Sequence, residues 1–197
     1  MNKVYAVLYP IIWIYMKLLH PWKAVGLEHV PEGAALLCGN HSTLGDPLYV
    51  VCCLGWRRQV HVMAKEEIMK WPVIGFLLKK AGVFGVKRGK ADVGALKEAM
   101  RILRGGEKLL MFPQGTRVKE GEDSEARTGA ALFATRTGAP IVPIYIPRKK
   151  RRFRRTTIVF GEAYHPEFEG RKPTPEDYQR IADDLMERIR ALEGQEA

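Results

Sequence analysis

The chain of 197 residues is long enough to bury a full hydrophobic core and fits a single domain. Its 32 Lys and Arg against 22 Asp and Glu give a net charge of +10, which favours an anionic partner: phospholipid head groups, a phosphorylated substrate, an acidic carrier protein or nucleic acid. Three cysteines in apolar surroundings, Cys38, Cys52 and Cys53, argue against a disulfide framework or a zinc site and are typical of core residues in a reducing cytosol.

An uncharged, aromatic-rich run lies between Lys3 and Lys17 and contains Pro10. It is shorter than the roughly twenty apolar residues that a spanning helix needs. Tyr and Trp side chains beside flanking lysines suit the headgroup boundary of a bilayer. We therefore expect residues 1–22 to form a membrane-interface helix with Trp13 in contact with lipid. The alternative is a helix packed on the protein's own core; a cleaved signal peptide is disfavoured because no small-residue cleavage site follows.

Short apolar runs alternate with helical patterns over the remaining residues, 23–197, which is typical of an α/β domain. The runs that predict strands are 34–38, 60–63, 82–86, 108–112, 141–146 and 157–160. We expect a single domain of this class, with a mixed, largely parallel central sheet flanked by helices.

Two helices have clear core-facing stripes. The first carries Val93, Leu96, Met100 and Leu103 and ends at the glycine pair that follows. The last begins with Thr174 as cap, Pro175 at the first helical position and an acid two residues later. Its stripe consists of Tyr178, Ile181, Leu185, Ile189 and Leu192.

The segment 39–47, Gly-Asn-His-Ser-Thr-Leu-Gly-Asp-Pro, pairs an imidazole with a carboxylate. An imidazole titrates near pH 6.5, so at neutral pH it can take a proton from a hydroxyl and later return it. Five positions apart on a continuous helix, His41 and Asp46 would point about 140° away from each other. The pair therefore requires a turn, which Gly45 and the Ser-Thr dipeptide favour.

Each of these two residues also has a structural interpretation. Asp46 followed by Pro47 is a good helix start, with Asp as the N-cap and Pro at the first helical position. His41 follows an apolar run and could be a histidine whose ring is hydrogen-bonded at a strand end.

Two further loops after predicted strands carry polar groups suited to an anion. The loop 86–90 sets three cations in four residues, enough to hold a phosphate by charge and by the fork of Arg88. The second loop places Gly115, Thr116 and Arg117 after a strand, where backbone, hydroxyl and guanidinium groups can approach a ligand. Each loop alone could be an ordinary polar turn, but loops at strand ends often carry function.

Four blocks in order resemble those of the 1-acyl-sn-glycerol-3-phosphate acyltransferases, which convert lysophosphatidic acid to phosphatidic acid. They are the H-x4-D block at 41–46, the G-x-x-F-x-x-R block at 82–88, the F-P-E-G-T-R block at 112–117 and the apolar V-P-I block at 141–144. The resemblance covers roughly residues 22 to 160.

The resemblance implies that His41 is the general base for the free hydroxyl at the glycerol 2-position and that Asp46 stabilises the imidazolium. The substrate alcohol would attack the acyl thioester directly, without a protein nucleophile. The implied phosphate-binding residues are Lys87, Arg88, Gly115, Thr116 and Arg117. No metal or cofactor is expected; the acyl donor would be acyl-coenzyme A or acyl-acyl carrier protein, used as a co-substrate.

The sequence departs from the family pattern at two positions. Gln114, expected beside the acceptor site, replaces the usual Glu by a neutral amide of the same shape, which bears on acceptor affinity or selectivity rather than on catalysis. Gly85 stands where a larger apolar residue is common, and this favours a wider or looser strand beside Arg88.

The segment 148–155 holds seven cations in eight residues. We expect Arg151, Arg152 and Phe153 to contact anionic lipid or the acidic acyl donor; a solvated loop is the alternative. Nucleic acid is not an expected partner, because no recognition motif accompanies the run. The expected location is peripheral, on the cytoplasmic face of the cell membrane. Alternative functions are acylation of glycerol 3-phosphate or another lyso-lipid, and a non-catalytic module that binds anionic lipid.

Overall fold

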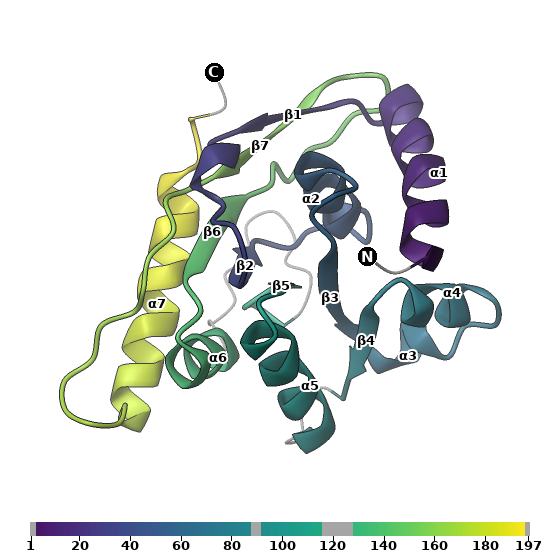
Figure 1. Ribbon diagram of the computed structural model, residues 1–197. Helices are drawn as coiled ribbons and strands as arrows, with labels where there is room; N and C mark the ends of the chain where they lie inside the picture. Colours follow the sequence, from purple (N-terminus) through teal and green to yellow (C-terminus); the bar gives the residue numbers. More distant parts are fainter. Residues whose placement is uncertain (1–2, 88–91, 116–127, 196–197) are drawn as a thin grey trace.

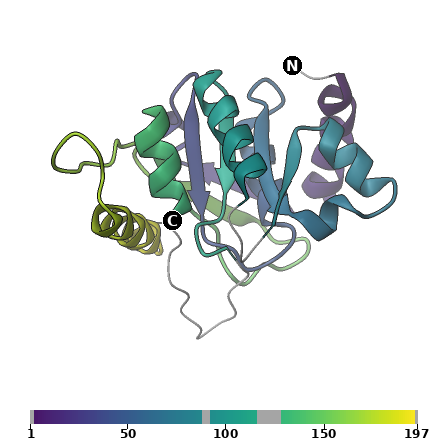
Figure 2. The same ribbon diagram turned by 90° about the horizontal axis from the view of Figure 1, so that it is seen from below.

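The computed structural model describes residues 3–87, 92–115 and 128–195. Within these ranges a seven-stranded sheet lies between two layers of helices (Figures 1 and 2). The strand order across the sheet is β1-β7-β6-β2-β5-β3-β4. The strands are β1 (Trp22–Val25), β2 (Ala35–Gly39), β3 (Val60–Lys65), β4 (Val83–Val86), β5 (Lys108–Met111), β6 (Ile141–Tyr145) and β7 (Thr156–Phe160).

Helices cover both faces of the sheet, and a short 3-10 turn, η1 (Leu27–His29), follows β1. One face packs against α1 and α2, and the opposite face packs against α5, α6 and α7. The α-helices are α1 (Lys3–Leu19), α2 (Asp46–Leu54), α3 (Glu66–Met69), α4 (Ile74–Lys80), α5 (Val93–Arg104), α6 (Gly129–Thr137) and α7 (Pro175–Ala191).

The sheet is mixed and largely parallel, which confirms the predicted fold class. Strands β6, β2, β5, β3 and β4 run parallel to one another, whereas β7 is antiparallel to β6 and parallel to β1. All six predicted strands occur. Strand β1 was not predicted, because its four residues are too short to show an alternation and include the exposed Lys23.

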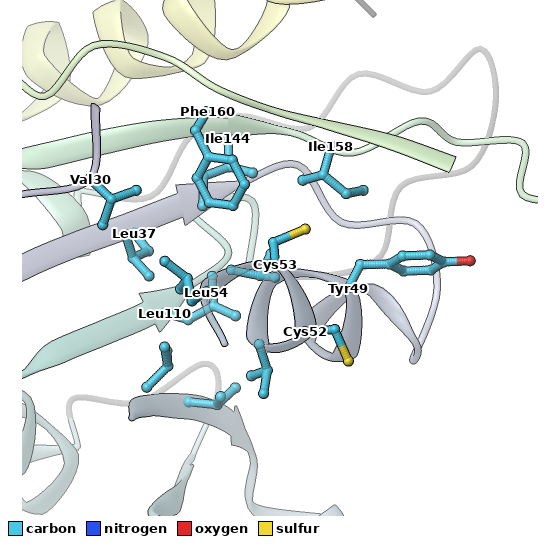
Figure 3. Close-up of a cluster of buried hydrophobic side chains, with 14 of the residues drawn as sticks. Val30, Leu37, Tyr49, Cys52, Cys53, Leu54, Leu110, Ile144, Ile158 and Phe160 are labelled. Atoms are coloured by element: carbon cyan, nitrogen blue, oxygen red, sulfur yellow. The ribbon is translucent and has the colours of Figure 1, made fainter. Parts of the chain in front are cut away.

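Strand β2 lies at the centre of the sheet and every one of its residues is buried. Leu36 packs with the α5–α7 layer, whereas Leu37 packs with α1 and α2, because successive strand side chains point to opposite faces. Figure 3 shows Cys53 and Leu54 of α2 in the same cluster as Leu37 and Leu110. Coverage of both faces explains why β2 reads as a nearly continuous apolar run.

The three cysteines are buried and unpaired, which confirms their interpretation as core residues. Burial raises the pKa of Cys52 to about 12, so its thiol stays neutral at physiological pH and is a poor nucleophile or metal ligand. Among the described residues no cluster of His, Cys, Asp and Glu could hold a metal ion.

Helix α7 begins as predicted. The Thr174 hydroxyl accepts the Asp177 N–H at 3.1 Å, and the Asp177 carboxylate accepts the Thr174 N–H at 3.0 Å, which completes a capping box. Every predicted stripe residue of α7 packs in the interior, at least partly buried (Tyr178, Ile181, Leu185, Ile189 and Leu192).

The predicted stripe of α5 is wrong at its first residue. Val93 is 57% exposed, and the buried face of this helix instead comprises Ala95, Ala99, Ile102 and Leu103. Asp92 caps the helix by accepting the Ala95 N–H at 3.0 Å. Val93 is the first residue of α5 and lies off its buried face, and spacing alone did not distinguish it from the core residues.

Helix α1 packs one side on the protein's own core, which was the alternative interpretation of the N-terminal run, and the contact of its other side with lipid stays a prediction. Its residues Tyr5, Tyr9 and Met16 are buried in the core cluster shared with α2 and the sheet. The opposite side exposes Val7, Ile11, Ile14 and Leu18. Within the described ranges, no helix has the length and apolar character that crossing a membrane would require.

Two substitutions in α5 test which of its residues belong to the core. Ile102 is fully buried, so Ile102→Ala should lower the free energy of unfolding by about 2–5 kcal/mol. Val93→Ala should change it by less than about 0.5 kcal/mol, because that side chain is largely exposed. Urea denaturation of both variants measures the difference; equal losses would contradict the placement of Val93.

Candidate active site

The candidate site lies where three neighbouring strands end. Strand β2 is flanked by β5 on one side and β6 on the other, and the three run parallel. Their carboxyl ends therefore meet at one edge of the sheet, and the chain direction across the sheet reverses at β2. Such switch points are the usual ligand-binding positions in open α/β sheets.

His41 and Asp46 form a buried pair at the end of β2. His41 Nδ1 and Asp46 Oδ2 lie 2.9 Å apart, with the two residues 9% and 0% exposed. The segment between them turns back on itself, and the Asp46 N–H donates to the Thr43 carbonyl at 3.2 Å. The predicted turn is thus confirmed. Because Nδ1 contacts the carboxylate, Nε2 is the ring nitrogen left for chemistry on a substrate.

The Asp46 carboxylate is wrapped by the turn that precedes it. Oδ2 also accepts the backbone N–H groups of Ser42 and Thr43 at 2.7 and 2.8 Å. Oδ1 accepts the Thr43 hydroxyl at 2.6 Å and the Lys150 ammonium at 2.8 Å. Burial favours the neutral acid, but the hydrogen bond to His41 and the charge of Lys150 outweigh it and hold the pKa of Asp46 well below its usual range.

The prediction that Asp46 is the N-cap of a helix is wrong. Gly45 occupies the cap position without a side-chain hydrogen bond, and Asp46 is the first residue of α2. The Asp46 oxygens accept donors from the preceding turn instead of from the helix that follows. Pro47 does stand in the first turn, as predicted.

Phe112 and Gln114, from the end of β5, fix the position of His41. The Phe112 ring stacks on the imidazole with centroids 4.1 Å apart and planes 19° apart. The buried Gln114 accepts the His41 backbone N–H through Oε1 at 3.0 Å. The amide oxygen of a glutamine is an acceptor, as a glutamate oxygen would be, so Gln114 is sufficient for this hydrogen bond. The contact of Gln114 with an acceptor substrate stays a prediction.

Asn40 joins the end of β2 to the end of β6. Its amide donates to the Ile146 carbonyl and accepts the Ile146 N–H, both at 2.8 Å. This paired contact fixes the backbone immediately before His41. The sequence alone assigned Asn40 no separate role, because its partner is 106 residues away.

Lys150 is the main site residue that sequence reasoning placed wrongly. It belongs to the basic segment 148–155, which was expected to face lipid or donor. Its side chain is only 7% exposed, and its Nζ donates to Asp46 Oδ1 at 2.8 Å and to Ser42 Oγ at 2.9 Å. The cause is the sheet order: β6 neighbours β2, so residues just beyond β6 reach the turn beyond β2. Within a run of seven cations, no local sequence feature distinguishes Lys150 from the other six.

An apolar cavity of about 310 Å³ adjoins the pair. His41 and Phe112 form part of its wall, together with side chains from α1, α2, β3, α3 and α4. Lys65, at the end of β3, is a cation on the same wall and pairs with Glu67 at 3.1 Å. Other wall residues include Tyr5, Tyr9, Leu48, Val51, Val62, Trp71, Ile74 and Leu78.

The structure describes two of the five predicted phosphate-binding residues. Lys87 is exposed after β4, which is three strands from β2 and therefore about 14 Å away across the sheet. Gly115 has φ of 67°, and its N–H closes a turn onto the Phe112 carbonyl at 2.9 Å, so a glycine is needed there. Arg88, Thr116 and Arg117 lie outside the described residues.

Gly85 permits a close approach of α3 to β4. A Cβ at this position would lie 3.1 Å from Glu66 Cα and from Met69 Cγ, closer than ordinary packing. The expectation of a loosened strand is therefore wrong: the small residue accommodates tight packing.

The fold and the site define an α/β protein with a buried His–Asp pair on the wall of an apolar cavity. Comparison with known proteins agrees with this class. The profile of the Acyltransferase family matches residues 22–147, which is more than half of the chain, and the chain belongs to this family.

Similar proteins include several 1-acyl-sn-glycerol-3-phosphate acyltransferases. The one from Bacillus subtilis is 31% identical over 141 residues, which are 69% of this chain and 70% of the relative. A chloroplastic one from Brassica napus is 33% identical over 123 residues, 60% of this chain. This match spans only about a third of the plant protein, 35% of its length.

The fold is also that of a solved structure. The crystal structure of the lysophosphatidic acid acyltransferase PlsC from Thermotoga maritima superposes with a TM-score of 0.72 over 98% of this chain and 81% of that one. The two sequences are 21% identical. This likeness supports the three-layer architecture described above.

The charge state of Asp46 yields a pH-dependent prediction. Asp46→Asn leaves Lys150 buried beside a neutral amide and should cost about 3–5 kcal/mol at pH 7. A lowered pKa in the folded state stabilises the protein above the ordinary carboxyl pKa of about 3.9, and this contribution is lost as the pH falls through the folded value. The difference between wild type and variant should therefore narrow below about pH 4.

Urea denaturation at a series of pH values measures that difference. Asp183→Asn, on the exposed side of α7, is the matched control and should show little effect. A constant penalty at every pH would contradict the ionised state assigned to Asp46.

Proposed function

We propose that this protein transfers a fatty acyl group from a thioester to the sn-2 hydroxyl of 1-acyl-sn-glycerol 3-phosphate, giving phosphatidic acid for phospholipid biosynthesis. The observation that carries the proposal is the His41–Asp46 pair at 2.9 Å on the wall of an apolar cavity. The names of the relatives support the same reaction, since those from Bacillus subtilis and Brassica napus are 1-acyl-sn-glycerol-3-phosphate acyltransferases.

The proposed reaction begins with a proton transfer to His41. Nε2 removes the proton from the glycerol hydroxyl as its oxygen attacks the thioester carbonyl carbon. The tetrahedral intermediate then collapses, the C–S bond breaks, and the imidazolium returns the proton to the leaving thiolate. Asp46 stabilises the imidazolium through Nδ1–H, and general-base assistance of this kind typically contributes about 10²–10⁴-fold.

The apolar cavity suits an acyl chain. Its volume of about 310 Å³ lies at the lower end of the range typical of small-molecule pockets. A chain placed between α1, α2 and α4 would exclude water from the thioester and so suppress its hydrolysis. This arrangement would also bring the acyl carbonyl to the wall formed by His41 and Phe112.

The phosphate of the acceptor would be held by the cations and hydroxyl of the loops after β4 and β5. These are the residues that the family resemblance implies: Lys87, Arg88, Gly115, Thr116 and Arg117. Lys65 adds a cation on the cavity wall itself. The planar guanidinium group of an arginine can donate two hydrogen bonds to one phosphate, which fixes the orientation of the phosphate and adds affinity.

The proposed acyl donor is acyl-coenzyme A or acyl-acyl carrier protein. Either one carries negative charge, and the protein has a net charge of +10. The thioester is already activated for attack, so the proposed steps use no metal or further cofactor.

Replacement of His41 tests the proposed role of the base. His41→Ala should reduce phosphatidic acid formation by about 10³-fold while the thermal unfolding transition is retained. The matched control is His165→Ala, because His165 is an exposed histidine in the loop after β7. Normal turnover by His41→Ala would contradict the mechanism.

The assay should offer lysophosphatidic acid with each thioester donor and, separately, glycerol 3-phosphate or another lyso-lipid. Mass spectrometry of the product identifies both the acceptor and the site of acylation. Acylation of glycerol 3-phosphate alone would overturn the proposed acceptor but leave the acyltransferase class intact.

We further propose that the protein binds the cytoplasmic face of the cell membrane through the exposed side of α1 and adjoining residues. Helix α1 exposes Val7, Ile11, Ile14 and Leu18, and it lies beside α4 (Figure 1). In α4, Phe76 is 64% exposed, and Val73, which precedes the helix, is 71% exposed. Trp13 is partly exposed, with Lys17 over its ring. Apolar, aromatic and cationic groups together suit a bilayer interface.

The basic segment 148–155 adjoins the carboxyl end of α1. The Phe153 N–H donates to the Leu19 carbonyl at 2.9 Å, and the Phe153 side chain is 70% exposed. Arg151 and Arg152 are exposed beside it. The segment would therefore reach anionic head groups when α1 lies on the bilayer.

Removal of two cations tests the membrane contact. The double variant Arg151→Ala and Arg152→Ala should bind vesicles of phosphatidylglycerol and phosphatidylcholine about 30-fold more weakly, because each cation near an anionic surface contributes about 1 kcal/mol. Arg171→Ala with Lys172→Ala, in the loop before α7, removes the same charge elsewhere. Equal weakening by both pairs would indicate an effect of net charge alone.

A further inference from the structure

The cation that contacts the His41–Asp46 pair comes from a segment that otherwise faces outward. Residues 151–155 are exposed, whereas the Lys150 side chain is 7% exposed. Its Nζ lies 2.8 Å from Asp46 Oδ1 and 2.9 Å from Ser42 Oγ. Burying an ammonium group costs free energy, and the buried Asp46 carboxylate offsets that cost for Lys150.

We propose that Lys150 is a positioning residue of the His41–Asp46 pair, which sets the orientation of the Asp46 carboxylate and neutralises its charge before proton transfer. The proposal rests on the proposed acyltransferase function, and it adds a third side chain to the pair. Lys150 touches neither the imidazole nor the cavity wall in the described contacts, so it acts through Asp46.

The first part of the role is geometric. Asp46 Oδ2 accepts His41 and two backbone N–H groups, while Oδ1 accepts the Thr43 hydroxyl and Lys150. Lys150 thus contacts Oδ1 of Asp46, whereas the imidazole contacts Oδ2. Its second hydrogen bond, to Ser42 Oγ, ties the same ammonium group to the turn. Loss of Lys150 would leave Oδ1 with the Thr43 hydroxyl as its one described donor, which would hold the orientation of the carboxylate less firmly.

The second part is electrostatic. A lone buried carboxylate would draw a proton onto the imidazole, and a protonated imidazole cannot act as a base. The ammonium group of Lys150 opposes this, because two positive charges in a buried site repel each other.

The other titratable groups that face His41 do not supply a positive charge that opposes protonation of the imidazole. Lys65, on the same cavity wall, pairs with Glu67. Burial raises the pKa of Tyr9 to about 12 and that of Tyr5 still further, so both phenols of α1 stay neutral. Among the cations that the structure describes, Lys150 is the one in contact with Asp46.

The test compares Lys150→Met with Lys150→Arg in the full-length protein. Methionine keeps much of the length of the side chain and removes its charge, whereas arginine keeps the charge. The measurement is the pH dependence of kcat and KM for phosphatidic acid formation over about pH 5 to 9, the range in which an imidazole titrates. Lys172→Met removes the same charge from an exposed position in the loop before α7 and serves as the matched control.

We expect Lys150→Met to lower kcat about ten- to a hundredfold at pH 7 with KM for the acceptor little changed. The acidic limb of its profile should move to higher pH, so that the deficit shrinks in alkaline solution. Lys150→Arg and Lys172→Met should keep the acidic limb at its wild-type pH. A purely structural role would lower the rate equally at every pH, and that result would overturn the proposal, as would a wild-type rate in Lys150→Met.

A second measurement separates this proposal from the proposed function. If the wild-type protein forms no phosphatidic acid, the proposed function fails, and NMR titration of the His41 ring then tests Lys150 directly. The ring should take up its proton at higher pH in Lys150→Met than in wild type; an unchanged titration would overturn the positioning role. The same titration applies to a variant whose activity is too low to measure, and urea denaturation verifies that it folds.

Discussion

The Asp46 carboxylate is the constraint on which the rest of the site depends. It is 0% exposed, and a carboxylate removed from water must be compensated by donors or by charge. Here the compensation comes from Ser42 and Thr43 of the turn, from His41 and from Lys150. Each donor is also positioned by its contact with the carboxylate. A single buried charge therefore fixes the positions of the turn, the imidazole and Lys150 in the loop after β6.

The sheet makes this arrangement possible because it brings three strand ends to one point. Strand β2 is buried on both faces between two helical layers, so its end is held rigidly. Asn40 joins that end to β6, and Gln114 joins it to the loop after β5. His41 is therefore supported on both sides by hydrogen bonds between side chains and the backbone.

Helix α1 connects the cavity to the outer surface. Its Tyr5 and Tyr9 line the cavity and are buried, while Val7 and Ile11 on the opposite side are exposed. One helix thus separates the proposed acyl pocket from the proposed lipid surface. The same helix meets the basic segment at its carboxyl end through Phe153, which places apolar and cationic groups on adjoining parts of the molecule.

The sequence by itself determined the features that depend on near neighbours: six strands, the capping box of α7 and the turn that pairs His41 with Asp46. These follow from periodicity and local hydrogen bonding. Only the tertiary structure decided that Gln114 holds the His41 backbone and that Lys150, among seven cations, turns inward. Those contacts join residues 73 and 108 positions apart, and they exist because β2 pairs with β5 and β6, an order that local pattern does not encode.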